Sequence, residues 1–252
     1  MIDLSGKVVL VTGAGRGIGA AIVRAVVQTG GKAVLHDVTA GGNAAAVQRE
    51  LGAEHCHVLG GDLADGASVP KIWQAAQAWQ GRIDVLVNNA GIYEPADVDF
   101  EFDKWAASWH RTLEINLVAP GHFCREAIRH FRDRGGGIIV NLASRAAFRG
   151  DDHDYIHYAA SKAGVVAMTR TIARHFGRQN ITAFAIAPGF VRTDLNRAFF
   201  DQFGVEAAAK DIPLGEIAEP ADIANTVVFL ASGLARHATG TTIDINGASY
   251  VR

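Results

Sequence analysis

The chain has 252 residues, enough to bury a full core, and an α/β protein of this size is often a single domain. Lys and Arg total 24 against 26 for Asp and Glu, so there is no basic excess to attract nucleic acid or an anionic membrane. Apolar residues make up 49% but occur in short runs, none near the roughly 20 needed to cross a bilayer. Residues 1–7 lack the order of a signal peptide, which predicts a cytoplasmic protein.

Cysteine and histidine spacing gives no sign of a metal site. Cys56 and Cys124 are the only cysteines and lie in unrelated segments, so we expect buried free thiols. None of the 10 histidines stands at the spacing of a ligand motif. We therefore expect no metal.

Short apolar runs alternate with helical patterns along the chain. Residues 8–11 form the first such run, and beyond the glycines that end it Ile18, Ile22 and Val26 recur every four residues as one helical face. Further strands are expected at residues 33–35, around 58–59, and at 83–87, 138–140, 181–186 and 243–245. Helical patterns fill every gap between strands except the last. This alternation predicts an α/β fold, doubly wound: one domain over residues 1–252 with a seven-stranded parallel sheet and helices on both faces.

Ligands in such a sheet lie beyond the carboxyl ends of the strands, and a glycine-rich turn follows the first strand. Residues 12–19 read Thr-Gly-Ala-Gly-Arg-Gly-Ile-Gly, and glycines let the backbone approach a pyrophosphate at the positive end of a helix. This turn makes Gly13, Gly17, Ile18 and Gly19 candidate cofactor residues. Gly15, Gly17 and Ala20 also fit the G-x-G-x-x-A form of the dinucleotide fingerprint, and a glycine-rich turn without a ligand is the plainer alternative.

Asp37 ends the second predicted strand 18 residues after Gly19, near the separation expected for the acid that hydrogen-bonds an adenosine ribose. A 2′-phosphate near that carboxylate would meet like-charge repulsion, so NAD is expected rather than NADP. Arg16 keeps the alternative open, because its guanidinium could pair with a 2′-phosphate, lie over the adenine or point into water.

Tyr158 and Lys162 stand four residues apart, and Ser144 lies upstream across a polar loop. A helix makes such a pair neighbours on one face. An ammonium nearby favours phenolate and can lower the pKa of the tyrosine toward neutrality, so that Tyr158 exchanges a proton while Ser144 holds a substrate oxygen. A surface helix with a chance pair is the alternative.

Taken together, these motifs resemble those of the short-chain dehydrogenase/reductase family, from about Lys7 to the last strand. The resemblance implies a Rossmann-like, Ser-Tyr-Lys type enzyme whose catalytic residues are Asn116, Ser144, Tyr158 and Lys162. It also implies that Tyr158 and Lys162 touch the cofactor, and it adds further cofactor residues at the strand ends: Asp62, Leu63, Asn89, Ala90, Gly91, Pro188, Gly189, Val191 and Thr193. Asn88 is expected to be structural.

Two of these residues have a second interpretation. Asn116 could be only an interior polar group of the long helix before Pro120, a residue that tends to bend a helix; the resemblance makes it the site of a water linked to the lysine. Asp62 could cap a helix beginning near Ala64 or Asp65 instead of contacting adenine.

The interval from Ser144 to Tyr158 is one residue longer than in most of the family, and this loop is expected to border the substrate. Tyr155 is a rival proton donor only if the lysine partner is ignored, because Ala159 stands four residues beyond it. Arg145, Arg149 and His153 could meet a carboxylate or phosphate, or else pair with the loop's own aspartates. Tyr93 and Phe190 are further substrate candidates. Phe190 belongs to an apolar helical lid expected over about residues 190–215.

The predicted function is therefore reversible hydride transfer between NAD(H) and a secondary alcohol or carbonyl substrate. NADPH-dependent 3-oxoacyl-acyl carrier protein reductase is the main alternative, and a non-catalytic dinucleotide sensor is a further one. By resemblance we expect a homotetramer that pairs the long helices containing Asn116 and Tyr158 and packs the last strand across another subunit. The substrate itself stays open.

Overall fold

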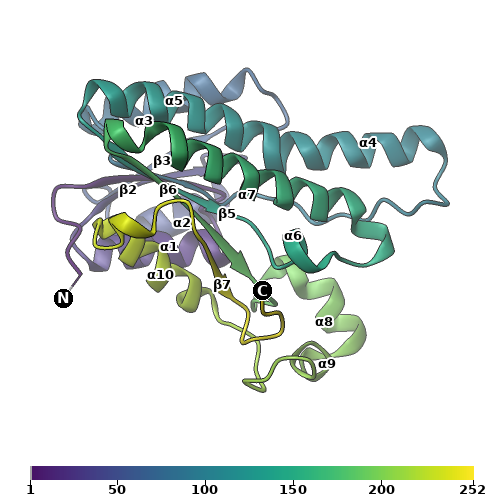
Figure 1. Cartoon of the computed structure of the whole chain (residues 1–252). Helices are drawn as coiled ribbons and strands as arrows, with labels where there is room; N and C mark the ends of the chain where they lie inside the picture. The colour runs from purple at the N-terminus through teal and green to yellow at the C-terminus, as the bar shows by residue number, and fades with distance from the viewer. Residues whose placement is uncertain (1) are drawn as a thin grey trace.

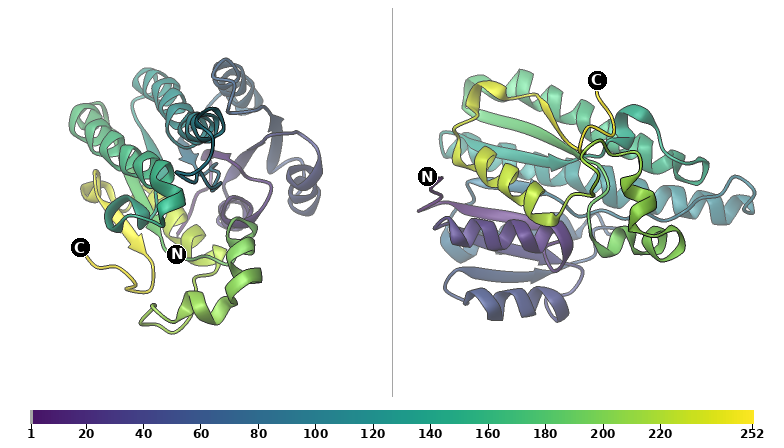
Figure 2. Two further views of the ribbon diagram at one scale, coloured as in Figure 1. Left: turned by 90° about the vertical axis from the view of Figure 1, so that its right-hand side faces the viewer. Right: turned by 90° about the horizontal axis from the view of Figure 1, so that it is seen from below.

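The computed structural model describes residues 2–252, apart from the side chain of Ala198. Seven strands form one sheet in the order β3-β2-β1-β4-β5-β6-β7, and each pairs in parallel with its neighbours. Helices cover both faces of this sheet (Figures 1 and 2). The predicted α/β fold with a seven-stranded parallel sheet is confirmed.

The strands lie close to their predicted places because the inner strands are apolar runs buried on both faces, whereas the edge strands β3 and β7 are only partly buried. In β1, for example, Val9 and Val11 face one core cluster while Val8 and Leu10 face the other. The fourth strand begins two residues later than predicted, because the Ile83 N–H bonds the His130 ring at 3.2 Å. The bounds are β1 Val8–Thr12, β2 Lys32–Asp37, β3 Cys56–Gly60, β4 Val85–Asn88, β5 Gly137–Leu142, β6 Ile181–Pro188 and β7 Thr242–Ile245.

Three helices cover one face of the sheet: α1 Gly17–Gln28, α2 Gly42–Leu51 and α10 Pro220–Ser232. The prediction that no helix fills the last gap between strands was wrong, since α10 lies there. Its buried residues share one face, which packs against α1 and the sheet, but Ala221 and Phe229 lie on the exposed face and weaken the polar stripe that marks a helical period. A capping box between Glu219 and Asp222, with Pro220 in the first turn, is the local signal for this helix.

The other face carries α3 Ser68–Gln80, α4 Phe102–Leu113, α5 Ala119–Asp133 and α7 Ile156–Phe176. A π-helical turn at Glu114–Val118 joins α4 to α5 and contains Asn116. Pro120 has no N–H to donate to the carbonyl four residues back, which is consistent with a widened turn at this place. In Figure 1, α4 and the start of α7 run past the strand ends on the side where α8 and α9 lie.

The segment expected to form a lid contains a short 3-10 turn at Asp194–Asn196, α8 Arg197–Phe203 and α9 Val205–Ala209. Its apolar side chains form a separate cluster around Ile212 and Ile217, against which Phe190 packs. The remaining short helix, α6 Ala146–Arg149, follows Ser144. Both cysteines are buried and free, as predicted, and no helix within residues 2–252 is long and apolar enough to cross a membrane.

Candidate active site

The loops after β1 and β4 are bonded together where the two strands end. The Thr12 hydroxyl accepts the N–H groups of Asn89 and Ala90, both at 3.0 Å. The Asn89 amide donates to the carbonyls of Thr12 at 2.9 Å and Gly13 at 3.0 Å. Gly13 has φ +63°, and a Cβ there would lie 2.9 Å from the Ala90 Cα. Only glycine allows this close approach.

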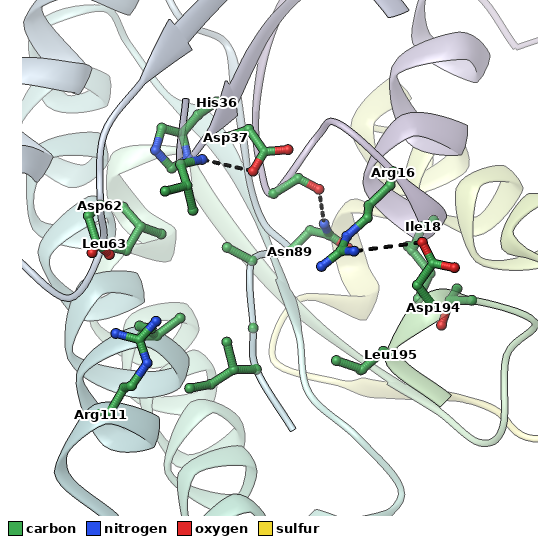
Figure 3. A pocket seen from close by; sticks show the side chains of 18 residues that line it. Arg16, Ile18, His36, Asp37, Asp62, Leu63, Asn89, Arg111, Asp194 and Leu195 are labelled. Atoms are coloured by element: carbon green, nitrogen blue, oxygen red, sulfur yellow. Dashed lines mark hydrogen bonds and ion pairs between the residues drawn. The ribbon is translucent and has the colours of Figure 1, made fainter. Parts of the chain in front are cut away.

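A cavity of about 260 Å³ opens over these loops. Figure 3 shows Asp62, Leu63 and Arg111 on one side of it and Arg16 and Asp194 on the other. The candidate cofactor residues that line this cavity are Gly13, Arg16, Gly17, Ile18, Asp37, Asp62, Leu63, Asn89, Ala90, Gly91 and Thr193. The structure thus brings together candidate residues from the ends of four strands and from the segment after β6.

Six other candidate cofactor residues do not line this cavity: Tyr158 and Lys162, described below, and Gly19, Pro188, Gly189 and Val191. Gly19 lies beneath the glycine turn, where a Cβ would come within 2.1 Å of the Gly13 carbonyl oxygen. Val191 is buried in the core, and Pro188 is the buried last residue of β6. At Gly189 a Cβ would lie 2.9 Å from the Asn246 Cβ. The latter four residues shape the floor of the site by close packing.

The first turn of α1 offers backbone N–H groups to the cavity. Arg16 is its N-cap residue, and in the described structure no side chain caps this helix. The first N–H groups of a helix have no partner within the helix, so they attract a phosphate. The glycine turn therefore has the form of a pyrophosphate site.

Asp37 lies at the end of β2 facing the glycine turn. Its carboxylate accepts the Gly15 N–H at 3.0 Å and the Val38 N–H at 2.8 Å. A Cβ on Gly15 would lie 2.1 Å from this carboxylate, which explains the glycine. The Arg16 guanidinium lies 3.7 Å from the Asp194 carboxylate, and its side chain is 69% exposed.

Asp62 does not cap a helix, because α3 begins only at Ser68. Its side chain accepts the Ala64 N–H at 2.9 Å in a local turn at the rim of the cavity. Asn88, by contrast, is 4% exposed and donates to the Asn141 side chain of β5 at 2.8 Å. The structure thus places Asn88 inside the sheet and Asp62 at the cavity.

The four candidate catalytic residues meet next to this cavity. A Cβ on Gly91 would lie 3.3 Å from the Asn116 amide oxygen and 3.5 Å from the Lys162 Nζ. Asn116 donates to the Ile92 carbonyl at 2.9 Å and accepts the Ile92 N–H at 2.8 Å. Its side chain thus fixes the loop after β4 against the π-helical turn.

Tyr158 and Lys162 are both buried on α7, and the Lys162 Nζ lies 5.7 Å from the centre of the phenol ring. Lys162 donates to the Leu142 carbonyl at 2.9 Å. Burial raises the pKa of Tyr158 to about 12, while a hydrogen bond with Ser144 lowers it and the charge of Asp151 raises it. Burial lowers the pKa of Lys162 to about 8.

The expectation that the lysine lowers the pKa of the tyrosine is therefore not met in this structure. The reason is that both groups are taken out of water, which disfavours the phenolate and the ammonium alike. Tyr158 is a neutral phenol at pH 7, ready to donate a proton, with the Ser144 hydroxyl beside it. The buried amine of Lys162 lies close enough to respond to any charge that develops there.

Tyr155, the rival proton donor, is held in an aromatic stack. Its ring lies on that of Tyr93 with centres 3.8 Å apart, and Tyr93 meets the edge of Tyr158 at 4.7 Å. The Tyr93 hydroxyl donates to Asp151 at 3.3 Å. Burial raises the pKa of Tyr155 as well. Tyr93 therefore touches the catalytic candidate directly, whereas Tyr155 supports Tyr93.

The substrate candidates on the loop after Ser144 separate into two groups. Arg145 is 7% exposed and lies over the Phe190 ring at 4.7 Å. Arg149 and His153 are exposed, and His153 pairs with its neighbour Asp154 at 3.1 Å. The alternative considered from the sequence, in which the loop's arginines pair with Asp151, Asp152 and Asp154, is not found in the described structure.

Several cavity residues were not identified from the sequence: His36, Val38, Ile92, Arg111, Ile115, Asp194 and Leu195. Most of them adjoin an identified residue, so adjacency is the signal that could have found them. Arg111 belongs to no motif; the available signal is its place one helical turn before Ile115 and therefore on the same face of the helix.

The residues present fit a nicotinamide dinucleotide. The glycine turn and the uncapped start of α1 suit a pyrophosphate, and the Asp37 carboxylate suits a ribose diol. A buried tyrosine and lysine stand beside the same cavity. Together these features define an oxidoreductase that uses a dinucleotide.

Comparison with known proteins supports the same class of enzyme. A family model described as "Enoyl-(Acyl carrier protein) reductase" matches residues 13–248. D-threitol dehydrogenase of Mycolicibacterium smegmatis is 38% identical over 99% of this chain and 95% of its own length. The 3-oxoacyl-(acyl-carrier-protein) reductase FabG of Vibrio harveyi is 34% identical over 99% of this chain and 100% of its own.

A solved structure gives the same picture. The crystal structure of 3-ketoacyl-(acyl-carrier-protein) reductase from Brucella melitensis complexed with NADH has a TM-score of 0.89 and 29% identity, covering 99% of this chain and 100% of that one. The chain belongs to the short-chain dehydrogenase/reductase family. It is an oxidoreductase that uses a nicotinamide dinucleotide and acts on hydroxyl or carbonyl groups of small molecules.

Proposed function

We propose that the protein catalyses reversible hydride transfer between NAD(H) and a secondary alcohol or its carbonyl form, with Tyr158 as the acid and base. One observation carries this proposal. Ser144, Tyr158 and Lys162 lie together beside a cavity that Asp37 lines. The dinucleotide supplies the hydride acceptor or donor. The chain supplies position and a proton path.

The roles follow from the contacts. Ser144, hydrogen-bonded to Tyr158, holds the substrate oxygen. Tyr158 donates its proton to that oxygen during reduction and accepts it during oxidation. Lys162 lies 5.7 Å from the ring, so its protonated form stabilises the phenolate. Asn116 keeps the backbone at Ile92 in place near the lysine.

NAD is proposed over NADP because Asp37 occupies the position that discriminates between them. Its carboxylate is fixed by two backbone N–H groups and would repel a 2′-phosphate. Arg16 is paired with Asp194 and therefore does not neutralise the charge of Asp37. The cofactor residues proposed to act here are the cavity residues identified from the sequence, with Gly19, Pro188, Gly189 and Val191 as support.

Reduction of 3-oxoacyl-acyl carrier protein is the second candidate, favoured by the 34% identity to the Vibrio harveyi reductase. A substrate panel run with NAD and NADP, followed by the absorbance of the reduced nicotinamide, separates the two. We expect turnover of a small secondary alcohol with NAD. Turnover restricted to 3-oxoacyl thioesters with NADPH would support the second candidate instead.

A homotetramer is proposed from the exposed faces of the long helices and the sheet edge. Phe102 on α4 is 73% exposed although it begins a strongly amphipathic helix, and β7 is the edge strand. Apolar exposure and an unpaired edge both favour a partner subunit. Light scattering at micromolar concentration should give four times the mass of the chain, and a monomer would contradict the proposal.

A further inference from the structure

Arg145, the residue directly after Ser144, is a buried cation at the active site. Its backbone N–H donates to the Pro188 carbonyl at 3.0 Å, its guanidinium lies over the Phe190 ring at 4.7 Å, and its Nη1 donates to the Ser249 hydroxyl at 2.5 Å. Only 7% of the residue is exposed. Two contacts therefore hold the guanidinium in one place, and a third fixes the backbone.

No carboxylate among residues 2–252 lies within 4 Å of this guanidinium. Of its five N–H groups, the hydrogen bonds found in the described chain use Nη1 alone. The other guanidinium nitrogens are not among the fully enclosed atoms without a partner in the described chain, so they remain accessible to a small ligand. Arg145 therefore has donor groups that the chain itself does not satisfy.

Arg145 lies between Ser144, which it follows directly, and the lid segment, because its guanidinium lies over Phe190. Burial and the nearby Arg149 lower its pKa, while Asp151, Asp211 and Tyr93 act in the opposite direction. Tyr93 touches Tyr158, whereas Asp211 follows the lid helix α9. The guanidinium thus lies across the region where a substrate held by Ser144 would extend.

Asp151 does not take the place of a substrate anion. Its Oδ1 accepts the Tyr93 hydroxyl at 3.3 Å and the Asp152 N–H at 3.0 Å. Burial raises the pKa of this carboxyl. Asp151 is therefore occupied by Tyr93, and Arg145 is left for a ligand.

We propose that Arg145 binds a carboxylate of the substrate, so that the enzyme acts on short hydroxy acids and the corresponding oxo acids. This inference rests on the proposed function and narrows it. A guanidinium fork matches a carboxylate with two parallel hydrogen bonds, and its ring stacking keeps it oriented before the substrate arrives. The substrate is thereby held at two points, its oxygen at Ser144 and its carboxylate at Arg145.

The test compares 2- and 3-hydroxypentanoate with their methyl esters, which lack the negative charge and carry one more methyl group, in oxidation by NAD. Wild-type enzyme should prefer an acid over its ester. Arg145→Gln should lower kcat/KM for the acid by about 30- to 100-fold, mainly through KM, and change the ester by less than about threefold, as expected for loss of a charge-assisted hydrogen bond. Arg145→Lys should restore part of the preference, and the exposed Arg174→Gln serves as the matched control.

A second experiment measures ligand binding to the wild-type enzyme, so its result does not depend on whether a variant folds. Pentanoate should bind the complex with NADH at least tenfold more tightly than pentanamide, measured by the fluorescence of bound NADH. Equal binding of the two, or equal use of acids and esters, would overturn the role of Arg145. The proposed function would fail differently, by an absence of turnover with every alcohol and carbonyl of a broad panel.

Discussion

Replacement of Asp37 by serine tests how the chain chooses its cofactor. The change removes one negative charge but keeps an oxygen that can accept the Gly15 N–H, which now bonds the carboxylate at 3.0 Å. A ribose hydroxyl donating to this carboxylate would place the oxygens of a 2′-phosphate about 4 Å away. Two like charges at 4 Å repel by about 1 kcal/mol in water and about 4 kcal/mol at an effective dielectric constant of 20.

Asp37 is partly exposed, so about 2 kcal/mol is a reasonable value, equivalent to about 30-fold in an equilibrium constant. Asp37→Ser should therefore raise kcat/KM for NADP by about 10- to 100-fold. It should also lower kcat/KM for NAD by about tenfold, because a hydrogen bond to a charged group is lost.

The assay is the ratio of kcat/KM for NAD and NADP with one substrate. Asp103→Ser, on the exposed start of α4, removes the same charge away from the cavity and should leave the ratio unchanged. A wild-type preference for NADP, or a ratio that does not move in Asp37→Ser, would refute the reasoning.

Two further predictions concern stability. Burial lowers the pKa of Lys162 to about 8 from about 10.4 in an unfolded chain, so the folded state loses its proton first and stability should rise between about pH 8 and pH 10.4. Lys162→Met should accordingly raise the free energy of unfolding at pH 7, measured by urea denaturation, by about 1 to 3 kcal/mol while turnover is lost. The exposed Lys71→Met should change neither stability nor turnover. A Lys162→Met variant less stable than wild type would contradict the argument. Gly19→Ala places a Cβ 2.1 Å from the Gly13 carbonyl oxygen and should lower stability by about 1 to 3 kcal/mol and weaken NAD binding. Gly177→Ala, with no atom within 4 Å of its Cβ, is the control in calorimetry, and equal effects of the two changes would be inconsistent with a crowded glycine turn.

The fold was predictable because the inner strands are apolar runs covered on both faces, and such runs stand out in a sequence. The long helix predicted to contain Tyr158 and Lys162 is α7, Ile156–Phe176. Helix α10 was missed because apolar residues, Ala221 and Phe229, also stand on its exposed face and weaken the polar stripe that marks an amphipathic helix.

At the site, spacing predicted which residues come together but not how their charges respond. Tyr158 and Lys162 were correctly placed on one helix, yet the pKa of Tyr158 is raised because the phenol is buried, and a sequence does not give burial of a side chain. Arg145 shows the same limit. Its loop is rich in aspartates, and only the structure reveals that none of them pairs with it.

The most direct test of the central claim replaces each neighbouring tyrosine by phenylalanine and measures kcat with NAD. Tyr158→Phe removes the hydroxyl beside Ser144 and should lower kcat by about 10²- to 10⁴-fold while NADH still binds. Tyr155→Phe keeps the ring that stacks on Tyr93 at 3.8 Å and should retain most of the activity. If Tyr155→Phe were inactive and Tyr158→Phe active, the proton transfer assigned to Tyr158 would be wrong.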